Sequence, residues 1–145
     1  MLQYLQRFNV NLIGVIMATI VGQILSTIWY TLLFHKAWDK YSGFNEEELK
    51  KIKATSHKNP RSIYLSILEQ FISTYAYAIL VHNLSISTFM GAAILGAVVW
   101  FGFMATVGIN EVIWHGEKLQ FYVLNQACYL VRTILKGLVY FYVII

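Results

Sequence analysis

The chain has 145 residues, of which 58% are hydrophobic and only 12% are charged. This composition excludes an ordinary soluble domain, which could not hide so much apolar surface from water. The net charge of +4 comes mainly from lysines in one segment between two apolar runs, and a membrane face accounts for them better than nucleic acid does. We therefore predict an integral membrane protein whose partner is the lipid bilayer and not nucleic acid.

Four long apolar segments divide the chain, at about residues 9–34, 62–82, 88–110 and 119–144. Each can cross the bilayer, because about 20 helical residues cover its hydrocarbon core of about 30 Å. The first segment is too long for the apolar region of a cleaved signal peptide, and no cleavage pattern follows it. The predicted fold is all-α: a single domain over residues 1–145 that forms a four-helix transmembrane bundle.

The segment between the first two spans, residues 35–61, is the one sizeable polar stretch. In it Asn45 precedes three glutamates, residues 46–48, and lysines follow toward residue 53. An asparagine can cap the free amides at a helix start, and glutamates suit the positive end of the helix dipole. We predict a short amphipathic helix that lies on the membrane surface in the first loop and ends before Pro60.

Lysine and arginine are distributed unevenly between the two ends of the spans. The first and third loops hold eight of them, whereas the opposite side holds only Arg7. The eight are Lys36, Lys40, Lys50, Lys51, Lys53, Lys58, Arg61 and Lys118. By the positive-inside rule we predict a multi-pass protein of the cytoplasmic (inner) membrane, with loops one and three cytoplasmic and both termini on the outer side.

Polar side chains inside the first, second and fourth spans recur three and four residues apart, which places them on one face of each helix. Three such stripes turned inward would form a polar interior beneath an apolar surface that faces the lipid. The members that we take as candidates for a pathway or a binding site are Gln23, Glu69, Gln70, Tyr77, Asn125, Tyr129, Arg132 and Lys136.

Glu69 and Arg132 are the most informative of these residues, because a charge at membrane depth is costly and needs a reason. At 1.5 Å per residue, Glu69 lies about 10 Å and Arg132 about 20 Å from the loop face. Their side chains can meet directly or through a water molecule. They form a structural ion pair that fixes helix register, belong to a transport or proton pathway, or snorkel to the lipid headgroups. For Lys136, nearer the outer surface, we expect the ammonium group to snorkel to the lipid headgroups.

The third span carries small residues in place of a polar stripe. Small side chains at helical spacing let another helix approach closely. We predict that this face packs against another helix, or that it forms the contact of a homo-oligomer or of a partner membrane subunit. The small residues are Ala92, Ala93, Gly96, Ala97, Gly102 and Ala105.

Two pairs of side chains spaced four residues apart could contribute to a metal site. They are His35 with Asp39 and Glu111 with His115, and we expect both pairs at the cytoplasmic surface. Nothing in the sequence makes the pairs neighbours, and solvated loop groups account for them, so we predict no metal and no cofactor. Because no nucleophile is paired with a base, a membrane enzyme or a metal-binding protein is only the third function hypothesis.

A motif at the end of the first span combines aromatic residues with a lysine. Its members are Trp29, Tyr30, Phe34, Lys36 and Trp38. In this pattern the chain resembles a family of small bacterial four-pass membrane proteins catalogued as a domain of unknown function. The likeness extends to an Asn-x-Ala-x-Tyr pattern at Asn125, Ala127 and Tyr129. It implies a four-helix membrane fold and no particular activity.

The chain departs from that family pattern at two positions of the motif. Leu32 stands where the family has proline, and His35 stands where it has glycine. Proline kinks or ends a helix, so we expect the first span to run straighter in this chain.

Two functions of different classes remain open from the sequence. The first is an oligomeric pore or carrier for a small solute or ion, with the polar stripes along its path. The second is a structural or accessory membrane subunit, in which the same residues form hydrogen bonds between helices. A bundle interior filled by tyrosines would favour the second hypothesis.

Overall fold

The computed structural model describes residues 8–56 and 59–145, and over these residues it contains helices and no strand. Four helical segments of the described chain are long and apolar enough to cross a membrane. They are Leu12–Leu33, Pro60–Asn83, Phe89–His115 and Leu119–Ile144. The predicted all-α fold with four spans is confirmed, and the chain is a multi-pass membrane protein.

Two of the spans are interrupted by short π-helices. The first consists of α2 (Leu12–Ile28) and η1 (Trp29–Leu33), and the third of α6 (Phe89–Val99), η2 (Trp100–Ala105) and α7 (Thr106–His115). The second and fourth spans are the continuous helices α5 (Pro60–Asn83) and α8 (Leu119–Ile144). The third span extends beyond the predicted residue 110 and ends at Gly116, whose φ of 71° is the left-handed conformation typical of a helix end.

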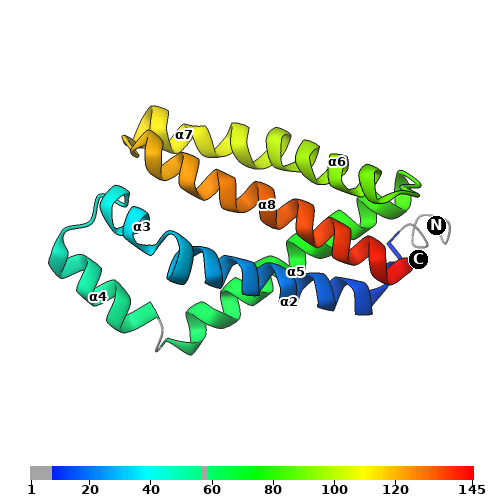
Figure 1. Cartoon of the computed structure of the whole chain (residues 1–145), viewed down its shortest axis with the longest axis horizontal. Helices are drawn as coiled ribbons and strands as arrows, with labels where there is room; N and C mark the ends of the chain where they lie inside the picture. The colour runs from blue at the N-terminus through cyan, green and yellow to red at the C-terminus, as the bar shows by residue number, and fades with distance from the viewer. Residues whose placement is uncertain (1–7, 57–58) are drawn as a thin grey trace.

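Helix α8 lies at the centre of the bundle (Figure 1). It packs against α2 on one side and against α6 on the other, and α2 also packs against α5, which crosses behind them. The described chain begins and ends at one end of the bundle, together with residues 84–88 (Figure 1). We call this the terminal end. The opposite, loop end carries the first loop and residues 116–118.

The first loop contains two helices, α3 (His35–Tyr41) and α4 (Glu46–Ser56). Helix α4 begins as predicted: Asn45 Oδ1 accepts a hydrogen bond from the Glu48 amide at 2.9 Å, and the Asn45 amide donates to Glu48 Oε2 at 2.8 Å. This reciprocal pair is a capping box. Helix α3 was not predicted, because it has only seven residues and no capping side chain at its start, although Gly43 with φ 83° follows its end.

The first span does not run straight into the first loop, although proline is absent from its end. Residues Trp29–Leu33 form a π-helix, and Phe34 leaves the helical conformation with φ −124° and ψ 18°. The Thr31 hydroxyl donates to the Thr27 carbonyl at 2.7 Å, which competes with the backbone ladder. The rings of Trp29 and Phe34, 4.5 Å apart, then pack across the break. The first span therefore continues past Leu32 and breaks at Phe34 without a proline.

The terminal half of the bundle is tightly packed. Its core contains Val15, Ala18, Tyr77, Ala78, Val81, Ala92, Tyr140 and Phe141. On the third span, Ala92, Gly96 and Ala105 are buried, and a Cβ atom at Gly96 would lie 3.1 Å from the Cα atom of Ile134 on α8. Part of the small-residue face is thus used inside the chain. A Cβ atom at Gly102, in contrast, would meet no heavy atom within 4 Å.

Candidate functional site: a buried arginine beside a cavity

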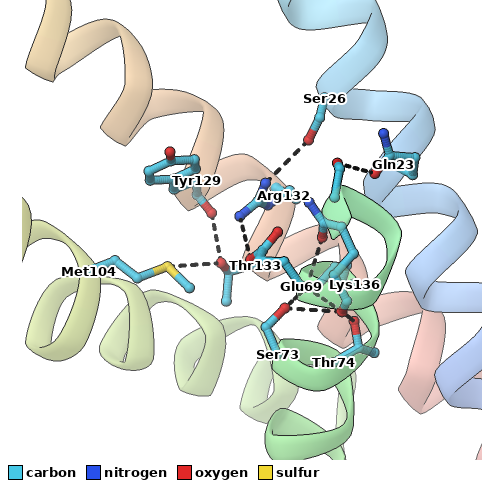
Figure 2. A network of polar contacts seen from close by, with 12 residues as sticks. Gln23, Ser26, Glu69, Ser73, Thr74, Met104, Tyr129, Arg132, Thr133 and Lys136 are labelled. Carbon is cyan, nitrogen blue, oxygen red and sulfur yellow. Dashed lines mark hydrogen bonds and ion pairs between the residues drawn. The ribbon is translucent and has the colours of Figure 1, made fainter. Parts of the chain in front are cut away.

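Polar residues of α2, α5 and α8 meet in one network in the middle of the bundle (Figure 2). At its centre Lys136 is only 3% exposed. Its ammonium group donates to Ser73 Oγ at 2.7 Å and to Gln70 Oε1 at 3.2 Å. A Cβ atom on residue 22 would lie 2.6 Å from Lys136 Cδ, so Gly22 provides the space for the lysine stem.

The expectation that Lys136 snorkels to the headgroups was therefore wrong. The lysine points into the bundle because α5 offers oxygen acceptors at the depth of its ammonium group, and because glycine on α2 leaves room for the methylene chain. A cation with such ligands is stabilised within the protein and has no need to reach the headgroups. Sequence spacing alone does not reveal that Gly22 and Gln70 face this side chain.

Arg132 lies next to this cluster and is bound much more loosely. Its Nη2 atom lies 3.5 Å from Glu69 Oε1, and Nη1 donates to Ser26 Oγ at 3.4 Å (Figure 2). Good hydrogen bonds between such ions are about 2.7–2.9 Å long. The guanidinium also lies over the Tyr129 ring, 4.8 Å from its centroid. Its Nε atom is buried without a hydrogen-bond partner in the described part of the chain.

The Glu69–Arg132 pair is asymmetric in its exposure. The arginine side chain is 9% exposed, whereas the glutamate side chain is 53% exposed. The predicted meeting of the two side chains takes place directly, at the edge of a cavity. The exposed Glu69 side chain can therefore rotate away from the arginine, whereas the buried Arg132 side chain has little room to move.

A cavity of about 600 Å³ lies in front of Arg132, between α5, η2, α7 and α8. We call it the Arg132 groove, and its lining residues are Ser66, Glu69, Phe103, Met104, Val107, Gly108, Gln126, Tyr129 and Arg132. A second cavity, of about 230 Å³, shares Gly108, Gln126 and Tyr129 with it and includes Glu111 and Glu117 at the loop end. The two cavities therefore adjoin each other between the loop end and the buried arginine.

Gln126 is a groove residue that the sequence analysis missed. It is 7% exposed, and its Oε1 atom has no hydrogen-bond partner within the described residues. Its Nε2 atom would lie 2.5 Å from a Cβ atom on residue 108, so glycine is needed there for the two helices to approach. The spacing of Tyr122, Gln126 and Tyr129 on one face of α8 is the signal that could have revealed it.

The other predicted pathway residues form hydrogen bonds between helices. Gln23 Oε1 accepts from the Ser66 hydroxyl at 3.0 Å. Tyr77 donates to the Ala92 carbonyl inside the terminal core. Asn125 Oδ1 accepts from the Tyr30 hydroxyl at 3.0 Å, and Asn125 also lines the smaller cavity. Of the eight candidates, Glu69, Tyr129 and Arg132 line the Arg132 groove, whereas Gln70 and Lys136 belong to the buried cluster.

Of the two residue pairs considered for a metal, Glu111 and His115 contact each other, whereas Asp39 is paired with a lysine. His115 Nδ1 lies 2.8 Å from Glu111 Oε2, and Asp39 Oδ2 is paired with Lys53 Nζ at 2.5 Å. Across residues 8–56 and 59–145, no group of three or more histidine, cysteine, aspartate or glutamate side chains converges. His35 and Asp39 line a separate cavity beneath α4.

Glu117 lies outside the spans, at the mouth of the groove. Burial, followed by the negative charge of Glu111, raises the pKa of its carboxyl group. A raised pKa means that the folded state binds the Glu117 proton more tightly than the unfolded chain does. Stability therefore falls as the pH rises from the ordinary glutamate pKa, at about 4.3, to the folded pKa.

We expect Glu117→Gln to flatten this part of the stability profile. Thermal unfolding in detergent between pH 4 and 8 measures it, with the exposed Glu47→Gln as the control, and equal slopes for Glu117→Gln and wild type would contradict the prediction.

The aromatic motif of the first span contacts the start of α8. Tyr30 bonds to Asn125, and the Trp38 ring lies 6.1 Å from the ring of Phe121. The two sequence patterns that carry the family resemblance are thus in direct contact. A family model described as "Protein of unknown function (DUF1761)" matches residues 13–141. The chain belongs to this family.

The DUF1761 match covers all four spans, and it confirms the resemblance that the motif predicts. No curated protein and no solved structure matches the chain. Membership of the DUF1761 family supports a small membrane protein and no specific function.

Proposed function

We propose that this protein is a membrane carrier that binds a small solute with a carboxylate or phosphate group at Arg132. One observation carries the proposal: a guanidinium that is nine-tenths buried lies at the deep end of a cavity of about 600 Å³ with an unpartnered Nε atom and only a long ion pair. Arginine recognises carboxylate and phosphate oxygens through parallel N–H donors. An anion in the groove would replace Glu69 on the guanidinium and accept parallel hydrogen bonds from it.

The contrast with Lys136 supports this assignment. Both residues are cations of α8, four positions apart, and both are buried. Lys136 has three oxygen ligands on α5, the nearest at 2.7 Å, and does not line the Arg132 groove. We assign Lys136 to the stability of the bundle and Arg132 to binding. In this proposal neither residue takes part in catalysis.

A carrier fits the packing better than a permanently open pore. The groove reaches Arg132 from the loop end, whereas the terminal half is filled by the core that contains Tyr77, Tyr140 and Phe141. Release on the other side would require helices to move, as in alternating access. The π-helix η2, which supplies Phe103 and Met104 to the groove, is a suitable place for such movement, because π-helical turns are often found at functional sites.

We extend the proposal to the orientation of the protein in the membrane and to its assembly with other subunits. We place the loop end in the cytoplasm of the inner membrane, because it carries the excess of lysine and arginine. The groove then receives solute from the cytoplasmic side. For the predicted homo-oligomer or partner subunit, Gly102 is the part of the small-residue face with open space in front of it.

The second candidate function is a structural or accessory membrane subunit. It is favoured by the polar residues that pair between helices, such as Gln23 with Ser66 and Tyr30 with Asn125. Under this function Arg132 would also serve packing, and its removal would destabilise the protein. The two functions therefore differ in what an Arg132 substitution does to stability.

Uptake into liposomes that contain the purified protein tests the carrier. The probes are radiolabelled inorganic phosphate and acetate. Arg132→Gln is expected to lower uptake about tenfold or more, since one lost charge-assisted hydrogen bond of about 1.5 kcal/mol corresponds to that factor. Glu69→Gln removes the competing carboxylate and is expected to lower the solute concentration needed for half-maximal uptake.

Arg61→Gln is the matched control, because it removes an arginine outside the groove. It should transport like wild type, and all variants should unfold near the wild-type temperature. Absence of uptake of both probes by wild type, together with early unfolding of Arg132→Gln, would favour the structural subunit.

A further inference from the structure

A cavity of about 390 Å³ lies at the loop end, between the end of the first span and helix α4. We call it the interface pocket, and it is lined by Tyr30, Thr31, His35, Trp38, Asp39 and Lys53, among others. Lys53 of α4 and Asp39 of α3 form an ion pair at 2.5 Å, which joins the two helices beside the pocket. The pocket does not share residues with the Arg132 groove.

Only one oxygen of the Asp39 carboxylate has a partner among the described residues. Lys53 bonds to Oδ2, whereas Oδ1 is buried and has no hydrogen-bond partner among the described residues. A buried carboxylate oxygen without a donor is costly. A ligand that fits here therefore brings an N–H donor, and an ammonium group satisfies the charge as well.

The same pocket also offers groups for an anion. Lys53 is 53% exposed and can contact a second ligand group beside Asp39. His35 lies one helical turn before Asp39 and lines the same cavity. A ligand with an ammonium group and a neighbouring phosphate would thus contact Asp39 with one end and Lys53 and His35 with the other.

The surroundings indicate that this ligand carries an apolar tail. Leu32 and Leu33, beside the pocket residue Thr31, are 68% and 60% exposed on the surface of the first span. Trp38 is of the type that gathers at the boundary between headgroups and acyl chains. A pocket that contains charged side chains at this level, beside an exposed apolar stretch of the first span, suits a lipid better than a free solute.

We propose that the interface pocket binds the headgroup of a phospholipid that carries a primary amine, of the phosphoethanolamine type. The primary ammonium supplies the N–H donor that Asp39 Oδ1 requires. A quaternary ammonium has no such donor, and a glycerol headgroup has no positive charge. The pocket therefore selects this lipid over phosphatidylcholine and phosphatidylglycerol, and the bound lipid fixes α4 against the first span.

Native mass spectrometry of the full chain in mild detergent tests the selection. The probes are phosphatidylethanolamine, phosphatidylcholine and phosphatidylglycerol with identical acyl chains, and soluble phosphoethanolamine. Wild type is expected to bind phosphatidylethanolamine about fivefold more than either other lipid, since one hydrogen bond of about 1 kcal/mol gives that ratio. Asp39→Asn should reduce the preference to about one.

Two further variants separate selection from loss of structure. Lys53→Met keeps Asp39, so it should bind all three lipids less but retain the preference for the amine. Glu47→Gln, on the same helix but outside the pocket, should behave as wild type. The proposal is overturned by equal binding of the three lipids to wild type, by a preference that survives Asp39→Asn, or by binding of soluble phosphoethanolamine without the lipid. None of these results depends on transport through the Arg132 groove.

Discussion

Gln70→Leu is expected to lower the free energy of unfolding by about 2–3 kcal/mol, because it leaves the buried Lys136 ammonium with too few ligands. Gln70 is 1% exposed, and both its side-chain oxygen and its carbonyl face this ammonium. Leucine has a similar volume, so the loss reports on the missing oxygen more than on a cavity. Unfolding in mixed micelles by a denaturing detergent measures the change.

The double variant Gln70→Leu with Lys136→Met is the decisive control. Methionine removes the buried charge, so the leucine at position 70 should then cost much less than it does beside lysine. A double variant that is destabilised by the sum of the two single changes would contradict the assignment of Lys136 to bundle stability. Uptake at Arg132 is expected to persist in any of these variants that remains folded.

Gly96→Val is expected to destabilise the bundle by a similar amount, about 2–3 kcal/mol, because it forces α6 away from α8. The Cβ atom would lie 3.1 Å from Ile134 Cα and 3.3 Å from the Thr133 carbonyl oxygen. These are backbone atoms of a long helix and cannot give way as a flexible side chain can. The same denaturing titration measures the effect.

Gly102→Val is the matched control on the same span. It adds the same side chain where a Cβ atom meets nothing within 4 Å, so stability should change little. Equal destabilisation by the two substitutions would show that the close approach of α6 and α8 is not what holds the third span. A loss of oligomers in Gly102→Val alone would instead mark Gly102 as part of an interface between copies.

Several parts of the fold could be predicted because they depend on local chemistry. The spans follow from the length of the apolar runs. Helix α4 follows from Asn45 and the glutamates after it, whose capping bonds form within one turn. Rise per residue placed Glu69 and Arg132 about 10 Å apart in height, so the sequence allowed their meeting through long side chains but did not require it.

The roles of individual polar residues could not be predicted in the same way. Lys136 was expected at the lipid surface, and it lies inside because Gly22 and Gln70 come from two other helices. Gln126 was missed because its importance depends on the approach of Gly108 from α7. The break at Phe34 depends on the Thr31 hydrogen bond and on the packing of the Trp29 and Phe34 rings, and no single residue type predicts either of them.

The sequence by itself determined that this is an all-α protein of four spans, that charge is buried in it, and which end carries the basic residues. Capping and helical period act over one or two turns, and hydropathy acts along a single segment of about 20 residues, so all three can be recognised without knowing which helices are neighbours. Only the tertiary structure decided which buried cation is saturated with ligands and which faces an open groove. That difference depends on rotation and distance between helices, which place Ser73 and Gln70 around Lys136 but leave Arg132 with a long ion pair and a cavity.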